Sequence, residues 1–240
     1  MSAVYDAGRA MPEEWVTDWR EALSPHLGKT EGPVLDVGAG TGIWATFIAE
    51  WFDCRVLGLE PSAGMRQKAL DIRKHDGVSY VGGRAEHLPL RDDSCGGAWM
   101  STVVHHIEDL EAAAHEARRV LHDDGPLLIR QAFNGRHDEI LWAKVFPSAL
   151  EIAEERHPRL EDVVRKFEDG GFQLQEVRRV RETAAGDLDQ YVRKIESRAD
   201  STLTLISESD FEEGLARLRQ MAEEAPAEPV TATLDLLVLR

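Results

Sequence analysis

The feature that most constrains this chain is a run of three closely spaced glycines directly after a short apolar segment. The apolar segment is Val34–Val37, and the glycines that follow it are Gly38, Gly40 and Gly42. Over Ile43–Phe52 the large apolar side chains then recur at helical spacing. The pattern predicts a strand, a tight turn and a helix, in which the glycines let the backbone approach a ligand closely.

The spacing of these glycines distinguishes between kinds of nucleotide-binding turn. A dinucleotide fingerprint requires Gly-x-Gly-x-x-Gly or Ala, whereas here the third glycine comes one residue early and Ile43 follows it. A P-loop is excluded because no Gly-Lys-Ser/Thr sequence follows. An NAD-linked dehydrogenase stays a formal alternative, against which the spacing argues.

Short apolar segments alternate with amphipathic segments along most of the chain. Strands are expected at 34–37, 55–60, 78–81, 97–101, 126–130, 172–180 and 230–239. Helices are expected at 12–27, 43–52, 63–74, 110–121, 138–155 and 188–205, with further helices ending at Gly170 and opening at Ser209. This alternation favours parallel pairing through right-handed crossovers, which gives an α/β, doubly wound, Rossmann-like sheet of seven mostly parallel strands. In such a sheet ligands bind beyond the carboxyl ends of the strands.

Capping residues predict where two of the helices begin. Ser62 follows a proline and is expected to be an N-cap. Ser209 is expected to open the last helix, because an acidic residue with capping-box spacing follows it three positions later. In the helix after Ser62, the spacing predicts that Met65, Ala69 and Ile72 face the core.

The composition limits the number of domains, the partners and the cellular location that we expect. Its 240 residues suit one domain with insertions, and 44 Asp plus Glu against 28 Lys plus Arg give a net charge of -16, which repels nucleic-acid phosphates. Cys54 and Cys95 lack the spacing of a metal site, so we expect reduced thiols and no metal. The sequence shows neither a leader pattern at its start nor an apolar run long enough for a membrane span, so we expect a cytoplasmic protein with no membrane partner.

Glu60 ends the second expected strand, at the distance along the chain where a doubly wound nucleoside site places its acid. A carboxylate there can accept both ribose hydroxyls in charge-assisted hydrogen bonds. The alternative is a strand-end glutamate in solvent, beside glycines that only make a turn.

Five segments, in this order, make the chain resemble the class I S-adenosylmethionine (SAM)-dependent methyltransferases, in particular the small-molecule branch that includes ubiquinone and menaquinone methyltransferases. The segments lie at 34–42, 59–62, 83–90, 104–107 and 116–121, within a resemblance that spans about residues 5 to 133. The resemblance implies a single SAM-dependent methyltransferase domain over residues 1–240, with SAM as cofactor and S-adenosylhomocysteine as product. The core is expected at about 30–133 and 172–240, and helical lid elements are expected at about 1–28, 134–170 and 184–228.

The same resemblance implies which residues contact the cofactor. They are Tyr5, Arg9, Asp36, Gly38, Ala39, Gly40, Thr41, Gly42, Glu60, Pro61, Ser62, Met65, Ala85, Glu86 and Ser101. The glycine loop, Asp36 and Ser101 would face the methionyl part, Glu60 would hold the ribose, and the residues at 61–65 and 85–86 would border the adenine. The segment of Tyr5 and Arg9 would fold over the cofactor, with a Tyr5 packed on the core as the alternative. Arg84 departs from the family pattern, because an aspartate often stands at that position.

His105 and His106 follow the fourth expected strand, at the rim where an acceptor should meet the methyl group. Imidazole has a pKa suited to a general base near neutral pH, which makes both residues catalytic candidates. We assign His105 to the pocket and His106 to a structural role. The alternative is that both residues only cap or pack the following loop and helix.

The predicted function is the transfer of a methyl group to O, N or C of a small metabolite, with secondary metabolism as one setting. Residues considered for acceptor contacts are Arg130, Gln131, Phe133, Trp142, Phe146, Tyr191 and Arg198. A second hypothesis is a SAM-fold protein that binds SAM without methyl transfer, as a cyclase or an interaction module. The expected partner is a small-molecule acceptor and not nucleic acid or a membrane, and a homodimer stays open beside a monomer.

Overall fold

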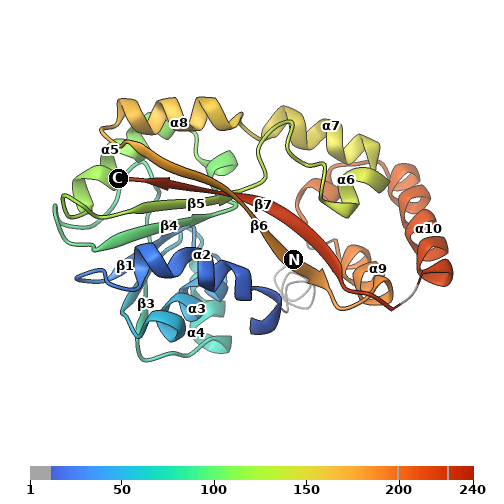
Figure 1. Cartoon of the computed structure of the whole chain (residues 1–240), viewed down its shortest axis with the longest axis horizontal. Helices are drawn as coiled ribbons and strands as arrows, with labels where there is room; N and C mark the ends of the chain where they lie inside the picture. The colour runs from blue at the N-terminus through green and yellow to red at the C-terminus, as the bar shows by residue number, and fades with distance from the viewer. Residues whose placement is uncertain (1–11, 199, 226) are drawn as a thin grey trace. The chain divides into compact units, whose positions relative to one another are not determined.

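Seven strands of the described residues form one sheet in the order β3-β2-β1-β4-β5-β7-β6 (Figure 1). The structure is a computed structural model that describes residues 12–198, 200–225 and 227–240. The strands are β1 Val34–Val37, β2 Val56–Leu59, β3 Val78–Val81, β4 Gly97–Ser101, β5 Leu127–Gln131, β6 Leu174–Ala185 and β7 Val230–Leu239. The first five strands pair in parallel, and β7 runs antiparallel to β5. The expected doubly wound, mostly parallel sheet of seven strands is confirmed.

The chain divides into two compact units, which we call the sheet unit and the helical unit. The sheet unit comprises Arg20–Gln131, Arg159–Arg179 and Asp235–Arg240. The helical unit comprises Ala132–Pro158, Val180–Leu234 and the described residues up to Trp19. The long strands β6 and β7 contribute residues to both units. The expected division into a core and lid elements stays a prediction.

The sheet unit has a helix layer on each side of its strands. Its helices are α3 Ile43–Phe52, α4 Ala63–Ile72, α5 Leu110–Val120 and α8 Leu160–Asp169, with the short 3-10 helix η2 Val104–His106 after β4. Figure 1 shows α3 and α4 on one side of the sheet and α5 and α8 on the other. All four residues of the central strand β1 are buried, as expected for a parallel strand covered on both faces. The glycines that follow β1 therefore begin at the end of a fully buried strand.

The helical unit is built from helices packed around aromatic side chains. Its helices are α6 Leu141–Val145, α7 Pro147–Arg156, α9 Leu188–Glu196 and α10 Glu208–Glu224, with the 3-10 helices η1 Glu13–Trp15 and η3 Thr202–Thr204. The rings of Phe146 and Phe211 stack with centroids 5.9 Å apart. The hydroxyl of Tyr191 accepts a hydrogen bond of 3.1 Å from the amide of Trp142, which links α9 to α6. The helix α2 Thr17–Leu27 begins in the helical unit and continues into the sheet unit.

The strongest sequence patterns predicted their elements well. The bounds of β1, α3, β3, β4 and β7 agree with those expected, and Ser62 caps α4 as expected by accepting from the amide of Met65. Among the three residues expected to face the core from α4, Ala69 is fully buried. Ile72 is the last residue of α4 and is 49% exposed, so the prediction for Ile72 was wrong.

The outer helices differ from expectation in their ends. The helix expected at 12–27 begins only at Thr17, after the 3-10 turn at Glu13–Trp15. The single helix expected at 138–155 is two helices, because Phe146 leaves the helical conformation before Pro147 begins α7. The helix expected at 188–205 ends at Glu196.

Two further expected bounds are corrected by the structure. The strand expected at 172–180 extends to Ala185 as β6. The N-cap of the last helix is Ser207, whose hydroxyl accepts from the amide of Asp210 at 3.1 Å, and not Ser209, which lies inside the first turn of α10.

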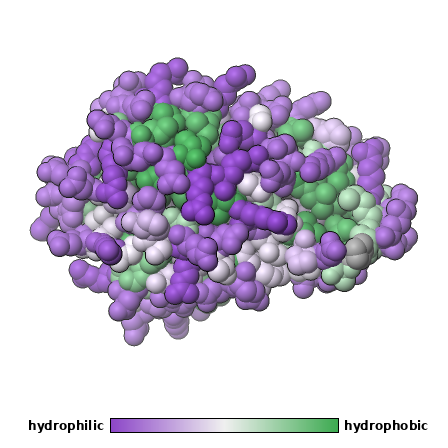
Figure 2. Space-filling view, in the orientation of Figure 1, coloured by the Kyte–Doolittle hydropathy of each residue, from purple (hydrophilic) through white to green (hydrophobic). Residues whose placement is uncertain are grey.

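Polar and charged side chains cover most of the face seen in Figure 2, with separate hydrophobic patches between them. This agrees with the large surplus of acidic residues in the sequence. In the part of the chain that the structure describes, no helix combines the length and the apolar character needed to cross a membrane.

The cap of α10 gives a test of the fold. We expect Ser207→Ala to lower the free energy of unfolding by about 1 kcal/mol, because the amide of Asp210 loses its acceptor. Ser209→Ala is the matched control, since Ser209 is equally exposed but lies inside the helix. Urea unfolding of both variants measures the difference, and equal losses would contradict the assignment of the cap.

Candidate active site

The glycine loop is held against the ends of two neighbouring strands. The amides of Gly38 and Ala39 donate to the backbone oxygen of Leu59, at 2.8 and 3.0 Å, so the loop is fixed to the end of β2. A Cβ on Gly38 would lie 2.4 Å from the Cγ2 atom of Val103, in the segment after β4. The loop therefore lies between the carboxyl ends of β2 and β4, where the sequence predicted a ligand site.

The last glycine of the loop is required by a side chain from β3. Gly42 has a φ of +81°, and a Cβ there would lie 1.9 Å from the hydroxyl oxygen of Tyr80. The amide of Gly42 donates to the backbone oxygen of Ala39 at 2.8 Å, which closes the turn, and α3 begins at the next residue. Gly38 and Gly42 thus allow neighbouring side chains to pack closely against the loop. The sequence did not indicate the role of Tyr80.

Glu60 connects the glycine loop to the start of α4. One carboxylate oxygen accepts from the amide of Gly40 at 3.0 Å, and the other accepts from the amide of Ser62 at 2.8 Å. The Nη1 atom of Arg66 donates to the backbone oxygen of Glu60 at 2.5 Å. Glu60 is only 9% exposed, so its carboxylate has a fixed position. Each carboxylate oxygen can accept more than one hydrogen bond, so hydroxyl donors can still bind there.

Asp36 lies beneath the loop and is 2% exposed. The pKa of its carboxyl is raised from the ordinary 3.8 to about 7. Burial is the main cause; the amide of Ala45 lowers the pKa by donating to the carboxyl, and the nearby charge of Glu60 raises it. Its Oδ2 atom has no hydrogen-bond partner among the described residues, and neither does the buried hydroxyl of Tyr80. Burial and the charge of Asp36 raise the pKa of Tyr80 to about 12. A cation bound above Asp36 would stabilise its ionised form.

The segment expected at the adenine edge is tied to the loop after β4. Ala85 is buried, and the Oε1 atom of Glu86 accepts from the amide of Glu108 at 3.0 Å. Arg84 contacts the carboxylates of Glu86 and Glu108, at 3.5 and 3.1 Å. Arg84, the residue that departs from the family pattern, therefore holds these two loops together.

The carboxyl ends of β4 and β5 bring together Ser101, Arg130 and Trp44. The Nη1 atom of Arg130 donates to the hydroxyl of Ser101 at 3.2 Å. The guanidinium carbon of Arg130 lies 5.1 Å from the ring centroid of Trp44, within cation–π range. Arg130 is only 6% exposed. Sequence analysis named Arg130 as an acceptor candidate, but it missed Trp44, whose helical spacing indicated only packing.

The two candidate catalytic histidines differ in their surroundings. His105 is half-buried, and its Nδ1 atom lies 3.2 and 3.4 Å from the side-chain amide atoms of Gln131, at the end of β5. His106 is exposed, and its ring centroid lies 4.0 Å from that of His105. Gln131 therefore contacts the ring of His105 at the carboxyl end of β5.

The remaining expected residues are placed as follows. Pro61 and Ser62 are exposed, Met65 is half-buried and Thr41 is buried. Tyr5 and Arg9 lie outside the described residues. In the helical unit, Phe133, Phe146 and Tyr191 are buried. Phe146 packs on Phe211, and the hydroxyl of Tyr191 accepts from the amide of Trp142. The guanidinium carbon of Arg198 lies 3.8 Å from the ring centroid of Phe211, and Arg198 pairs with Glu208.

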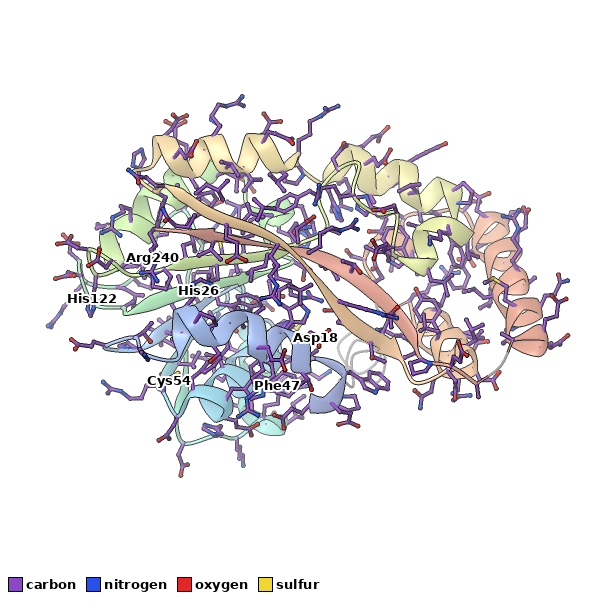
Figure 3. All side chains as sticks on the ribbon, in the orientation of Figure 1. Asp18, His26, Phe47, Cys54, His122 and Arg240 are labelled. Atoms are coloured by element: carbon purple, nitrogen blue, oxygen red, sulfur yellow. The ribbon has the colours of Figure 1, made fainter. Side chains whose placement is uncertain are left out.

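Other titratable groups lie at the opposite end of the strands from the glycine loop. At this end β5 begins and β7 ends, since Leu127 pairs with Leu239. His26 and Arg240 lie there, with His122 nearby (Figure 3). The Nε2 atom of His26 lies 3.8 Å from the carboxylate of Glu176, and burial lowers the pKa of His26. These groups belong to the packing at the edge away from the glycine loop.

A hollow of about 420 Å³ lies within the helical unit. Four carboxylates, those of Glu14, Asp18, Glu182 and Glu228, are among its lining groups, and the Oε2 atom of Glu182 accepts from the indole of Trp19 at 2.7 Å. None of the described residues that were expected to contact the cofactor lines this hollow.

The buried carboxyl of Asp36 gives a pH-dependent prediction. Because its pKa is raised in the folded state, the folded chain keeps a proton that the unfolded chain loses, so this group's effect on stability becomes unfavourable as pH rises from about 4 to 7. We expect Asp36→Asn to remove the effect, so the stability of the variant relative to the parent should rise by on the order of 3 kcal/mol between pH 4 and pH 8.

Urea unfolding at pH 4, 6 and 8 tests this, with the exposed Asp76→Asn as control. A difference between the Asp36 variant and the parent that does not change with pH would contradict the raised pKa.

Comparison with known proteins shows which family part of the chain matches. Residues 35–129 match the family described as Methyltransferase domain. A malonyl-acyl-carrier-protein O-methyltransferase of Methylococcus capsulatus is 35% identical over 107 residues, which are 42% of this chain and 38% of that protein. The chain spans about two fifths of the length of the first curated relatives that it matches.

Two solved structures share the fold over nearly the whole chain. One, from Anabaena variabilis, is described as "Putative methyltransferase from antibiotic biosynthesis pathway"; it has a TM-score of 0.73 and 23% identity, and the match covers 93% of this chain and 97% of that one. The cyclase SpnF has a TM-score of 0.65 and 18% identity, and the match covers 97% and 84%. The glycine loop and the acidic strand end both lie within residues 35–129, the segment that matches the Methyltransferase domain family.

Proposed function

We propose that this chain transfers a methyl group from SAM to an O, N or C atom of a small metabolite, in the cytoplasm. The observation that carries the proposal is the carboxylate of Glu60, held at the carboxyl ends of β1 and β2 by the amides of Gly40 and Ser62. A fixed carboxylate beside a glycine loop at this edge suits the two hydroxyls of a ribose. Secondary metabolism is one setting that fits a small acceptor.

The groups around the loop fit the other parts of SAM. The ammonium of the methionyl part suits the buried Oδ2 atom of Asp36, which has no hydrogen-bond partner in the described residues. The proposed contacts of the methionyl part are the glycine loop, Asp36 and Ser101, and those of the adenine are Pro61, Ser62, Met65, Ala85 and Glu86. Tyr5 and Arg9 are proposed to cover the cofactor.

In methyl transfer the protein mainly has to align the acceptor with the methyl group, because the methyl group is already reactive. When bound, SAM supplies a methyl group on a sulfonium, which is an electrophile that needs a nucleophile in line with it. The residues of this chain hold the reactants at the strand ends and keep water out. His105 is proposed to accept a proton from a hydroxyl or ammonium acceptor, with its Nδ1 atom held by Gln131. The exposed His106 is proposed to have a structural role.

A second candidate function is SAM binding without methyl transfer. The likeness in fold to the cyclase SpnF supports keeping it, because that protein is a cyclase on the same fold. We favour methyl transfer because the curated relatives that the chain matches over part of its length are methyltransferases by name. Under either function the elements at about 1–28, 134–170 and 184–228 are proposed as the lid. A small molecule is proposed as the partner, with a homodimer open beside a monomer.

Ribose binding by Glu60 is tested by substitution and by ligand chemistry together. We expect Glu60→Gln to weaken binding of S-adenosylhomocysteine by about tenfold or more, because two charge-assisted hydrogen bonds are lost. The parent should also prefer adenosine to 2′,3′-dideoxyadenosine, and the variant should lose most of that preference. Isothermal titration calorimetry measures both effects.

Glu50→Gln is the matched control for that experiment, because Glu50 is an exposed glutamate on α3, the helix that follows the loop. Titration with NAD under the same conditions should show no binding. Binding of NAD in place of SAM, or a ribose preference that survives in the Glu60 variant, would contradict the proposed site.

Turnover separates the two candidate functions. Incubation with SAM and a panel of small O, N and C acceptors should release S-adenosylhomocysteine, which mass spectrometry detects. The His105→Ala variant should lower turnover with hydroxyl acceptors more than with thiol acceptors, because a thiolate needs no base. Tight SAM binding without release for any acceptor would favour the second function.

A further inference from the structure

We propose that Arg130 holds a carboxylate group of the methyl acceptor, so that the natural acceptor is an acid. The proposal rests on the function proposed above and names the substrate class for the same site. It depends on four features of Arg130: its position at the strand ends, the way it is held, its burial and its charge.

The register of the sheet places Arg130 beside the expected methyl donor. Arg130 on β5 pairs with Ser101 on β4, and Trp99 on β4 pairs with Asp36 on β1. Directly paired residues share a face, and residues two apart on a strand do as well. Asp36, Trp99, Ser101 and Arg130 therefore lie on one face, with the acid on β1 and the guanidinium two strands away. The two opposite charges suit the ammonium of a cofactor on one side and the anion of an acceptor on the other.

Arg130 is held by groups that orient its guanidinium. Its Nη1 atom donates to the hydroxyl of Ser101, and the guanidinium carbon lies 5.1 Å from the ring centroid of Trp44. Trp44 in turn packs on Trp99, with ring centroids 5.1 Å apart. Stacking on an aromatic ring fixes the plane of a guanidinium, and a fixed plane favours two parallel hydrogen bonds to a carboxylate.

Burial makes such a contact strong and selective. Arg130 is 6% exposed, so water competes little for its donors. A guanidinium close to a sulfonium would repel it, and an acceptor carboxylate between the two cations would offset that repulsion. The net charge of -16 repels acids from the surface as a whole, so recognition of an acidic acceptor requires a local cation such as this one.

Arg130 could instead bind the methionyl carboxylate of the cofactor. The experiment distinguishes this carboxylate from a carboxylate of the acceptor. The protein is saturated with S-adenosylhomocysteine and titrated with acetate and malonate, and then with the neutral acetamide and malonamide. Tryptophan fluorescence reports binding, because Trp44 lies under the guanidinium. We expect a saturable response to the carboxylates and an affinity for the amides at least about tenfold lower.

Arg130→Gln should weaken carboxylate binding by about tenfold or more, and it should leave the affinity for S-adenosylhomocysteine within about twofold of the parent. Arg130→Lys keeps the charge without the planar fork, so it should bind carboxylates with an intermediate affinity, and it serves in place of the glutamine variant if that one fails to fold. Arg217→Gln, an exposed arginine paired with Glu213 on α10, is the matched control.

Three results would overturn the proposal: equal binding of carboxylates and amides, no saturable carboxylate response in the parent, or unchanged carboxylate binding in both Arg130 variants. A loss of S-adenosylhomocysteine affinity as large as the loss of carboxylate affinity would assign Arg130 to the cofactor and overturn it as well. A parent protein that does not bind S-adenosylhomocysteine would instead refute the proposed function on which this inference rests.

Discussion

The structure around the proposed site depends on one carboxylate that bridges two backbone amides. Glu60 accepts from Gly40, in the loop after β1, and from Ser62, at the start of α4. Each amide thus has a side-chain acceptor in place of water. The carboxylate therefore fixes the relative position of loop and helix before any ligand arrives, and a ribose would meet a group that is already oriented.

Stability and ligand binding oppose each other beneath that loop. Asp36 and the hydroxyl of Tyr80 are buried there without a hydrogen-bond partner in the described residues, and each raises the free energy of the folded chain. Gly42 admits the Tyr80 ring only because it has no side chain. Selection for stability alone would favour apolar groups at both positions. A site that must hold a cation gains from an acid whose charge is not already compensated by the protein.

The sequence predicted the sheet unit closely and the helical unit poorly, for a physical reason. In β1 and α3 the apolar period is strong and each element packs over its whole length, so local pattern and tertiary contacts agree. The break between α6 and α7 at Phe146, and the cap at Ser207, depend on packing and backbone geometry that spacing does not reveal. For the same reason Glu60, which follows a strand, could be predicted from the sequence. Tyr80 and Trp44 could not, because their roles come from residues distant in sequence.

Strand β5 brings together the proposed carboxylate-binding residue Arg130 and the residue Gln131, which contacts the proposed base His105. Arg130 and Gln131 are consecutive, so their side chains lie on opposite faces of the sheet. Arg130 joins Ser101 and Trp44 on one face, while Gln131 contacts His105. Both side chains leave the strand at its carboxyl end. An acid anchored by Arg130 would therefore extend past the carboxyl end of β5 to reach His105.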